Sequence, residues 1–308
     1  MMNKPTSMGL MSACCDLHTH TIASDGSDTP TRLVQLAHAA GLAGISVTDH
    51  DTVSGIPEAM EAGRRLDVDV LPGVELSVIA PSGNMHILGY GMDTRSPDLL
   101  ALLEEVQQAR AGRNTRILAL LRAAGCPLSL EEVERTAGGG QIGRPHFARV
   151  LVEKGYVSST GEAFARFLRK GAVAYAPKAV ITPGEAVRIL HASGGAAVLA
   201  HPLTLNCPGP DDLDRIVADL ASAGLDGMEC HYSEHTPSFT RICLDIAERY
   251  GLIPTGGSDY HGAVKPSIAL GRGKGDLCVP ARCLAEIRKR AEEKRASRCS
   301  LAEEIRAA

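Results

Sequence analysis

Histidine, aspartate and glutamate residues that could bind metal ions recur along this 308-residue chain, and most follow a short apolar run. The first cluster is Asp16-Leu17-His18-Thr19-His20, and the last is Gly257-Ser258-Asp259-Tyr260-His261. The candidate set is His18, His20, Asp25, His50, Glu75, His86, His201, Asp259 and His261. Neutral imidazoles and carboxylates are ligands of divalent Mn, Fe and Zn ions. The pattern therefore predicts a hydrolase that holds more than one metal ion.

Strand and helix patterns alternate around these residues, which indicates an α/β barrel. Apolar runs predict seven strands, at 13–17, 42–47, 68–74, 85–90, 196–199, 227–230 and 252–255. Each would be followed by a helix, so we expect parallel strands with an active site at their carboxyl ends. The candidate ligands fall at such ends, except for Asp25, in the loop beyond the first strand, and His86, which opens or lies within the fourth.

The alternation breaks between residues 95 and 178, where a long helical pattern from about Pro97 to Leu121 precedes shorter helices. We predict a barrel made of residues 13–94 and 179–296. An inserted helical subdomain over residues 95–178 would cap the substrate. Residues 1–12 are predicted to be a disordered leader, and residues 297–308 a charged tail beyond a closing helix at 281–290.

Composition limits the partners and the compartment. The 36 acidic residues outnumber the 32 Lys and Arg residues, whereas a groove for long duplex nucleic acid would show a basic excess. No secretory signal opens the chain and no apolar run could span a bilayer, so we predict a cytoplasmic protein without a membrane partner. The 9 cysteines show no disulfide spacing, and we expect free thiols, with Cys14 and Cys15 as small core residues.

Six segments resemble, in order, the motifs of the polymerase and histidinol phosphatase (PHP) family of metal-dependent phosphoesterases. They are DLHTHTIASDG, VTDHD, LPGVELS, MHILGY, LAHP and GGSDYHG. The resemblance implies a distorted (β/α)7 barrel and two or three divalent ions, with Mn expected and Fe or Zn as alternatives. Some family members have Cys where this chain has His201, which is a change of ligand and not a loss.

The resemblance also assigns the candidates to individual ions. Around one ion it places His18, His20, Glu75 and Asp259. Glu75 would bridge to a second ion, which is also held by His86 and His201. A third-site or phosphate-facing group would consist of Asp25, His50 and His261.

Two further stretches resemble one bacterial branch of the family, namely Gly143-Arg144-Pro145-His146 and Tyr175-Ala176-Pro177-Lys178. That branch includes 3′,5′-nucleoside bisphosphate phosphatases and 5′→3′ exoribonucleases that act on short RNA. We therefore predict removal of the 3′-phosphate of a nucleotide such as adenosine 3′,5′-bisphosphate, giving AMP and phosphate, by a metal-bridging hydroxide. A 5′→3′ exoribonuclease on short 5′-phosphorylated RNA, a histidinol-phosphatase-like monoester hydrolase and a catalytically decayed PHP module are the alternatives.

Catalytic and substrate-binding roles follow from these assignments. The candidates for protonating the leaving oxygen are Asp25, His50 and His261, because each would lie near the ions without being fully committed to them. Asp25 and His50 are also candidate substrate contacts. Further substrate contacts are expected from Arg110, Arg113, Arg144, His146 and Lys178, since Arg binds phosphate in a bidentate manner and Lys as a point charge.

Several of these residues also have simpler interpretations. Arg110 and Arg113 share a helix face, which could equally be an ordinary solvated surface. His38 and His191 lie inside predicted helices and are expected to be surface or packing residues. For His231 and His235, which follow a strand end, lining of the active site and a plain loop are equally good interpretations.

Overall fold

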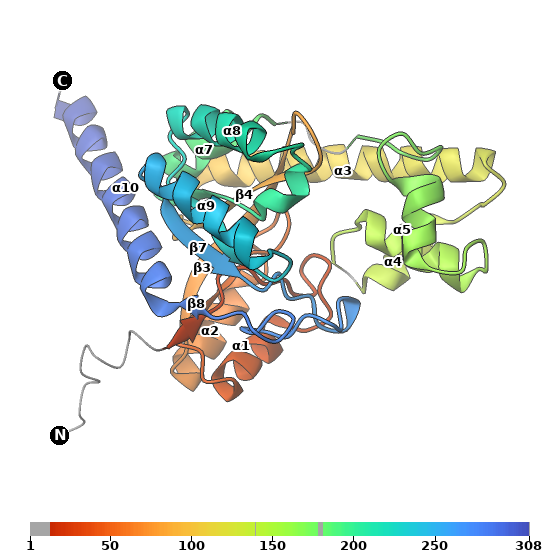
Figure 1. Ribbon diagram of the computed structural model, residues 1–308, viewed down its shortest axis with the longest axis horizontal. Helices are drawn as coiled ribbons and strands as arrows, with labels where there is room; N and C mark the ends of the chain where they lie inside the picture. Colours follow the sequence, from red (N-terminus) through yellow and green to blue (C-terminus); the bar gives the residue numbers. More distant parts are fainter. Residues whose placement is uncertain (1–12, 139, 178–180, 308) are drawn as a thin grey trace.

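The computed structural model describes residues 13–138, 140–177 and 181–307, so the predicted leader at 1–12 lies outside the described residues. Its centre is a curled six-stranded sheet in the order β2-β3-β4-β5-β6-β7 (Figure 1). These strands are β2 (Gly44–Val47), β3 (Asp69–Val78), β4 (Met85–Tyr90), β5 (Ala196–Leu199), β6 (Gly227–Tyr232) and β7 (Ile253–Gly257). A separate antiparallel pair joins β1 (Cys14–Cys15) to β8 (Val279–Pro280).

The segment after β1 lies between the two edge strands of the sheet. The backbone N–H of Asp16 donates to the carbonyl of Gly44 at 3.1 Å, and that of Leu17 donates to the carbonyl of Gly256 at 3.2 Å. This segment therefore contacts both β2 and β7 and closes the sheet into a distorted barrel. The closure brings the first ligand motif beside the last one.

The prediction that all strands are parallel was wrong for β4. This strand is antiparallel to both β3 and β5. No helix separates it from β3, and a short connection between Val78 and Met85 allows only a hairpin. In consequence Glu75 lies inside the long strand β3 and not at its end, and it faces Leu88 of β4 in the register.

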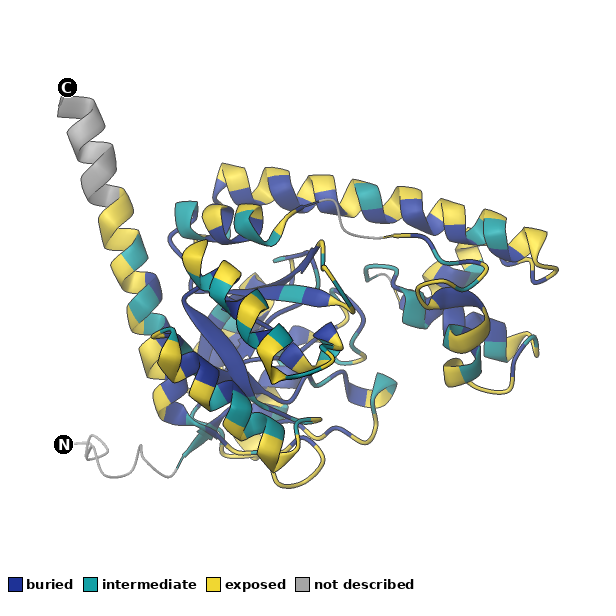
Figure 2. Ribbon diagram, turned by 45° about the horizontal axis from the view of Figure 1, so that its top comes forward, coloured by how far each residue is buried: buried dark blue, intermediate teal, exposed yellow. Residues whose placement is uncertain are grey.

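Helices cover the outside of the barrel, and their buried faces pack on the sheet (Figure 2). They are α1 (Pro30–Ala39), α2 (Ile56–Leu66), α7 (Pro183–Ala192), α8 (Pro210–Ser222), α9 (Pro237–Arg249) and α10 (Ala281–Ala307). The last helix is longer than predicted, because it continues past Arg290 to Ala307. Short turns follow β5 at η2 (Pro202–Leu205) and β7 at η3 (Gly262–Val264). No helix in the described part of the chain is long and apolar enough to cross a membrane.

A group of helices extends from the barrel between β4 and α7. They are α3 (Pro97–Ala123), α4 (Leu130–Ala137), α5 (Arg144–Glu153), α6 (Thr160–Ala163) and the π-helical turn η1 (Phe164–Leu168). Leu99 and Leu103, in the first half of α3, pack in the barrel core. Ile117 and Leu121, in its second half, pack in another core formed with α4, α5 and α6. Helix α3 thus connects two hydrophobic cores, and Figure 1 shows it running from one to the other.

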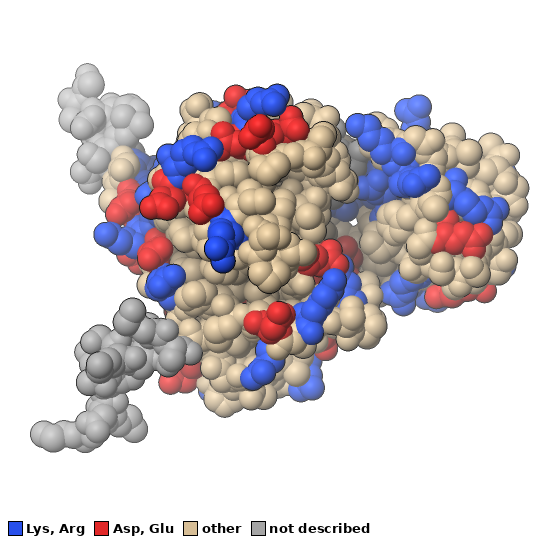
Figure 3. Space-filling model, in the orientation of Figure 1, with Lys and Arg blue, Asp and Glu red and all other residues tan. Residues whose placement is uncertain are grey.

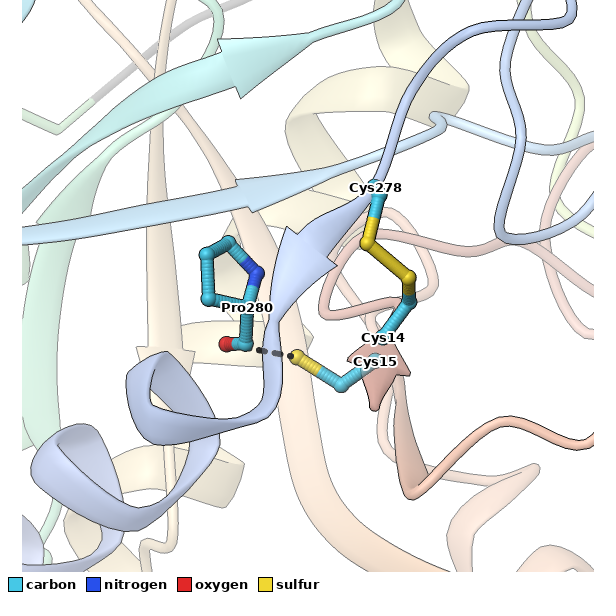
Figure 4. The surroundings of a disulfide bond; sticks show 4 residues. All are labelled: Cys14, Cys15, Cys278 and Pro280. Carbon is cyan, nitrogen blue, oxygen red and sulfur yellow. Dashed lines mark hydrogen bonds between the residues drawn. A yellow bond between two sulfur atoms is a disulfide. The ribbon is translucent and has the colours of Figure 1, made fainter. Parts of the chain in front are cut away.

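The expectation that all cysteines are free thiols is corrected by a disulfide between Cys14 and Cys278 (Figure 4). It joins β1 to the residue before β8, across a sequence separation of 264 residues. Cys15 is buried as a free thiol, as expected of a small core residue, and its Sγ–H contacts the carbonyl of Pro280. With one pair bonded, the cysteine content no longer argues for a reducing compartment.

The disulfide yields a stability prediction. The double variant Cys14→Ser/Cys278→Ser should lose about 2–4 kcal/mol of unfolding free energy, because the bond restricts the unfolded chain. Denaturant unfolding would measure the difference, with Cys207→Ser, a half-buried free thiol, as the matched control. Peptide mapping without reductant should recover the linked Cys14 and Cys278 peptides. Detection of free thiols at both Cys14 and Cys278 in protein prepared without reductant would show that the disulfide does not form.

Candidate metal centre

The predicted ligands come from the ends or edges of six barrel segments. His18 and His20 follow β1, His50 follows β2, and Asp25 lies in the loop before α1. The other ligand positions lie in β3, in β4, after β5 and after β7, and they are Glu75, His86, His201, Asp259 and His261. All nine converge, because their side-chain nitrogen and oxygen atoms form four overlapping groups with separations within 4.8 Å.

Glu75 lies at the centre of these groups. Its Oε2 is 3.3 Å from Nε2 of His18, 3.2 Å from Nε2 of His20 and 2.9 Å from Nδ1 of His50. Its Oε1 faces the other way, at 2.6 Å from Nδ1 of His86 and 2.8 Å from Nε2 of His201. Each oxygen of the carboxylate thus contacts different imidazoles, so Glu75 would be available to two ions at once.

The donor set fits metal ions because several of its atoms are buried without a hydrogen bond. Within the described residues, His18 Nε2, His20 Nε2, His50 Nδ1 and Glu75 Oε2 form no hydrogen bond, although they lie as close as 2.9–3.3 Å to one another. Buried polar atoms are nearly always paired, and four unpaired atoms aimed at one another need an explanation. A shared cation would satisfy all four.

The charges of the centre are strongly coupled. Burial would lower the pKa of His18, but Glu229, Glu75 and Asp259 outweigh it and hold that pKa well above its usual value. Burial would likewise raise the pKa of Asp25, yet His50 and His261 hold it well below its usual range. A histidine must be neutral to bind a metal ion, so a divalent cation would take the place of the protons that these carboxylates otherwise stabilise on the imidazoles.

Unusual backbone geometry accompanies the ligands. His201 and Asp259 have φ values of 23° and 57°, in the left-handed region that side chains other than glycine rarely adopt. Such conformations persist where the surroundings enforce them, and they cluster at functional sites. Asp49 secures the neighbouring loop, since it accepts hydrogen bonds from Thr21 and Ser24 at 2.6–2.7 Å. The loop that carries Asp25 is thereby held toward the centre.

Sequence reasoning missed three residues that hold the ligands in place. Glu229 contacts His18 Nδ1 and the backbone of His201. Tyr232 and Lys265 both donate to Oδ2 of Asp259, at 3.0 and 2.7 Å. The sequence could have indicated Glu229, because an acidic residue within an apolar strand is rare unless it is paired. For Lys265 the only available indication was its position four residues after His261.

The predicted cationic contacts are placed in different environments. Arg110 is paired with Asp51, so its charge is already compensated. Arg113 is buried, and burial with the nearby Arg110 and Arg144 lowers its pKa to about 9. Arg144 lies with its guanidinium 5.7 Å from the ring centre of Tyr175.

His146 and Lys178 complete the predicted substrate contacts. His146 is buried at the start of α5, where its Nδ1 accepts from the backbone N–H of Gly143 at 2.9 Å. Lys178 lies outside the described residues.

Two cavities adjoin the centre. One, of about 300 Å³, is lined by Asp25, His50 and other ligands together with side chains of the helical group, namely Pro145, Arg149, Thr160 and Phe164. The other, of about 310 Å³, contains His86 and extends between the β3–β4 hairpin and Arg144, Lys170 and Tyr175. Lys and Arg side chains gather on the part of the helical group that faces the barrel (Figure 3). The cavities therefore connect ligand residues to basic side chains.

The remaining histidines lie away from the ligand atoms. His191 Nε2 is 2.7 Å from Asp226 Oδ2, so His191 has a packing role, as predicted. His38 is exposed on α1. His231 and His235 line a further cavity beside Tyr232 that contains none of the nine predicted ligands, so this cavity does not support active-site lining by either histidine.

This barrel and its buried imidazole–carboxylate centre define a metal-dependent hydrolase. Residues 16–130 match the family model of the PHP domain. The 5'-3' exoribonuclease Rnm of Escherichia coli (strain K12) is 37% identical over 268 residues, which cover 86% of this chain and 90% of that protein. The chain belongs to the PHP family and is a metal-dependent phosphoesterase.

Two further comparisons agree with this assignment. The 3',5'-nucleoside bisphosphate phosphatase of Chromobacterium violaceum is 34% identical over 247 residues, covering 80% of this chain and 86% of that protein. A crystal structure of a protein assigned as a metal-dependent phosphoesterase from Bifidobacterium adolescentis superposes with a TM-score of 0.78 at 30% identity. It covers 91% of this chain and 96% of that one, which confirms the distorted barrel.

Proposed function

We propose that the protein hydrolyses the 3′-phosphate of 3′,5′-nucleoside bisphosphates, such as adenosine 3′,5′-bisphosphate, in the bacterial cytoplasm with Mn as its ion. The observation that carries the proposal is the cavity beside His86, which contains Arg144 and Lys170 next to the predicted metal ligands. These cations would bind one phosphate of a bisphosphate while the other lies at the metal centre. The relative from Chromobacterium violaceum supports this substrate class.

The reaction needs a nucleophile, charge neutralisation and a proton for the leaving oxygen. Divalent ions bound by the nine ligands would supply an activated water and neutralise the phosphoryl oxygens. Among the protein's own groups, Asp25 lies between two imidazoles, with its Oδ1 3.3 Å from Nε2 of His261 and its Oδ2 3.9 Å from Nε2 of His50. These three residues line the cavity, and we propose that the imidazoles deliver the proton while the ionised Asp25 orients them.

Residues 95–178 act in this proposal as a cap over the substrate. Arg149, Thr160 and Phe164 line the same cavity as Asp25 and His261, which supports that role. Arg144 and Arg113 would bind the second phosphate while the ions bind the first. His146 and Lys178 are proposed as further contacts, the latter because it follows the Tyr-Ala-Pro sequence at the end of the cap.

A 5′→3′ exoribonuclease on short RNA is the second candidate. The cavity beside His86 continues past the centre to Arg144, Lys170 and Tyr175, so a longer chain has space and basic contacts there. The Escherichia coli relative supports this activity. The two functions are compatible, because a 3′,5′-bisphosphate is the shortest molecule with a 5′-phosphate and a 3′-phosphoester. A catalytically decayed module is disfavoured by the complete ligand set.

One assay separates these possibilities. Purified protein with added Mn²⁺ should be compared on adenosine 3′,5′-bisphosphate, a short 5′-phosphorylated RNA and p-nitrophenyl phosphate. We expect the bisphosphate to give AMP and phosphate with the highest kcat/KM. Stepwise degradation of the RNA from its 5′ end with equal or better efficiency would make the protein primarily a nuclease. If the metal-loaded protein hydrolyses none of the three substrates, the result would favour a catalytically decayed PHP module.

A further inference from the structure

Glu229 is a buried acid in the middle of β6, and its side chain faces the interior of the barrel. Its neighbours Met228 and Cys230 pack in the core between the sheet and the helices, so the alternation of a strand turns Glu229 inward. The pairing of β6 with β7 is irregular between Glu229 and His231. Such irregularities re-aim side chains and occur often next to active sites.

The carboxylate of Glu229 contacts the ring of His18. Its Oε1 and Oε2 lie 3.2 and 3.3 Å from Nδ1 of His18. An imidazole whose Nδ1–H donates to a carboxylate presents the lone pair of its Nε2. In His18 that Nε2 faces Glu75 and Asp259 and is without a hydrogen bond among the described residues.

The same carboxylate also holds the backbone of a second ligand. The N–H of His201 donates to Oε2 of Glu229 at 2.7 Å. His201 is the residue with φ of 23°, its Nε2 contacts Oε1 of Glu75, and its ring stacks on that of His18 at 5.5 Å between centres. Glu229 therefore links the orientation of two imidazoles that reach the centre from different strands.

We propose that Glu229 is a positioning residue for the metal centre: it fixes the tautomer and orientation of His18 and holds His201 in its strained conformation. A carboxylate behind a ligand imidazole raises the basicity of the ligand and pre-organises it for the ion. The inference rests on His18 and His201 being ligands, which belongs to the proposed function, and it is independent of the substrate. It predicts that Glu229 acts through metal affinity and never touches the phosphoester.

The test compares Glu229→Gln with Asp226→Asn. Both acids are buried, both contact a histidine, and Asp226, just before β6, is paired with His191, Arg290 and Lys294 away from the ligands. Metal-free protein would be titrated with Mn²⁺ and followed by electron paramagnetic resonance against a competing chelator. We expect Glu229→Gln to weaken binding of at least one ion by about 10–100-fold, and Asp226→Asn to leave the affinity within twofold of wild type.

Each outcome decides the matter. Unchanged Mn²⁺ affinity in Glu229→Gln would overturn the inference, even if stability or turnover fell. Equal losses of affinity in both variants would show a general structural effect and would overturn it as well. If Glu229→Gln does not fold, Glu229→Asp keeps the charge but shortens the side chain, and it must show the loss. Failure of the wild-type protein to bind Mn²⁺ would instead contradict the proposed ligand set.

Discussion

Replacement of Asp25 by asparagine should lower kcat by about 10²–10⁴-fold, the contribution of a positioned proton-transfer group, because the imidazoles that would transfer the proton lose the carboxylate that orients them. Asp25 lies between His50 and His261, so the amide would remove the charge that aligns both imidazoles. The groups around Glu75, His86 and His201 do not contain Asp25, and the ions bound there should be retained. Steady-state kinetics and elemental analysis of the same preparation would measure both quantities.

Asp28→Asn is the matched control for this variant. Asp28 lies in the same loop, is half-buried and accepts a hydrogen bond from Tyr260, but it is not among the ligand groups. We expect it to retain wild-type turnover. Unchanged kcat in Asp25→Asn would reject its catalytic role, and loss of all bound metal would assign it to metal binding alone.

Replacement of Arg113 or Arg144 by alanine should raise KM for a 3′,5′-bisphosphate strongly and KM for p-nitrophenyl phosphate much less. Hydrogen bonds to charged groups contribute about 1.5–3 kcal/mol, which corresponds to an increase in KM of about 10–150-fold. The selective effect is expected because only the bisphosphate has a second phosphate for these arginines. Initial rates over a range of both substrates would test it.

Arg116→Ala provides the control for Arg113, because Arg116 lies on the same helix and is exposed. It should change KM for neither substrate. Equal increases with both substrates in Arg113→Ala and Arg144→Ala would refute a second phosphate site. The buried position of Arg113 makes a parallel measurement of unfolding necessary, and Arg113→Lys retains a cation if the alanine variant is unstable.

Much of the barrel was predictable because its strands are short apolar runs with chemically distinctive residues beside them. The strand that contains His86 and the strand before His201 were located in this way, at Met85–Tyr90 and Ala196–Leu199. The direction of β4 was predicted wrongly although the ten residues between the predicted strands at 68–74 and 85–90 are too few for a helical crossover and favour a hairpin. The pairing of Arg110 with Asp51 could not be predicted either. The spacing of Arg110 and Arg113 shows that they share a helix face, but it does not show which residues that face contacts.

The residue types alone predicted which side chains could bind metal ions, because imidazoles and carboxylates lie next to individual strands of the sequence. Which of these side chains face each other depends on the tertiary fold. Glu75 meets His201 across 126 positions, Glu229 meets His18 across 211, and Cys14 bonds to Cys278 across 264. Such contacts arise from closure of the barrel, and no local pattern of residues encodes the partner on a distant strand.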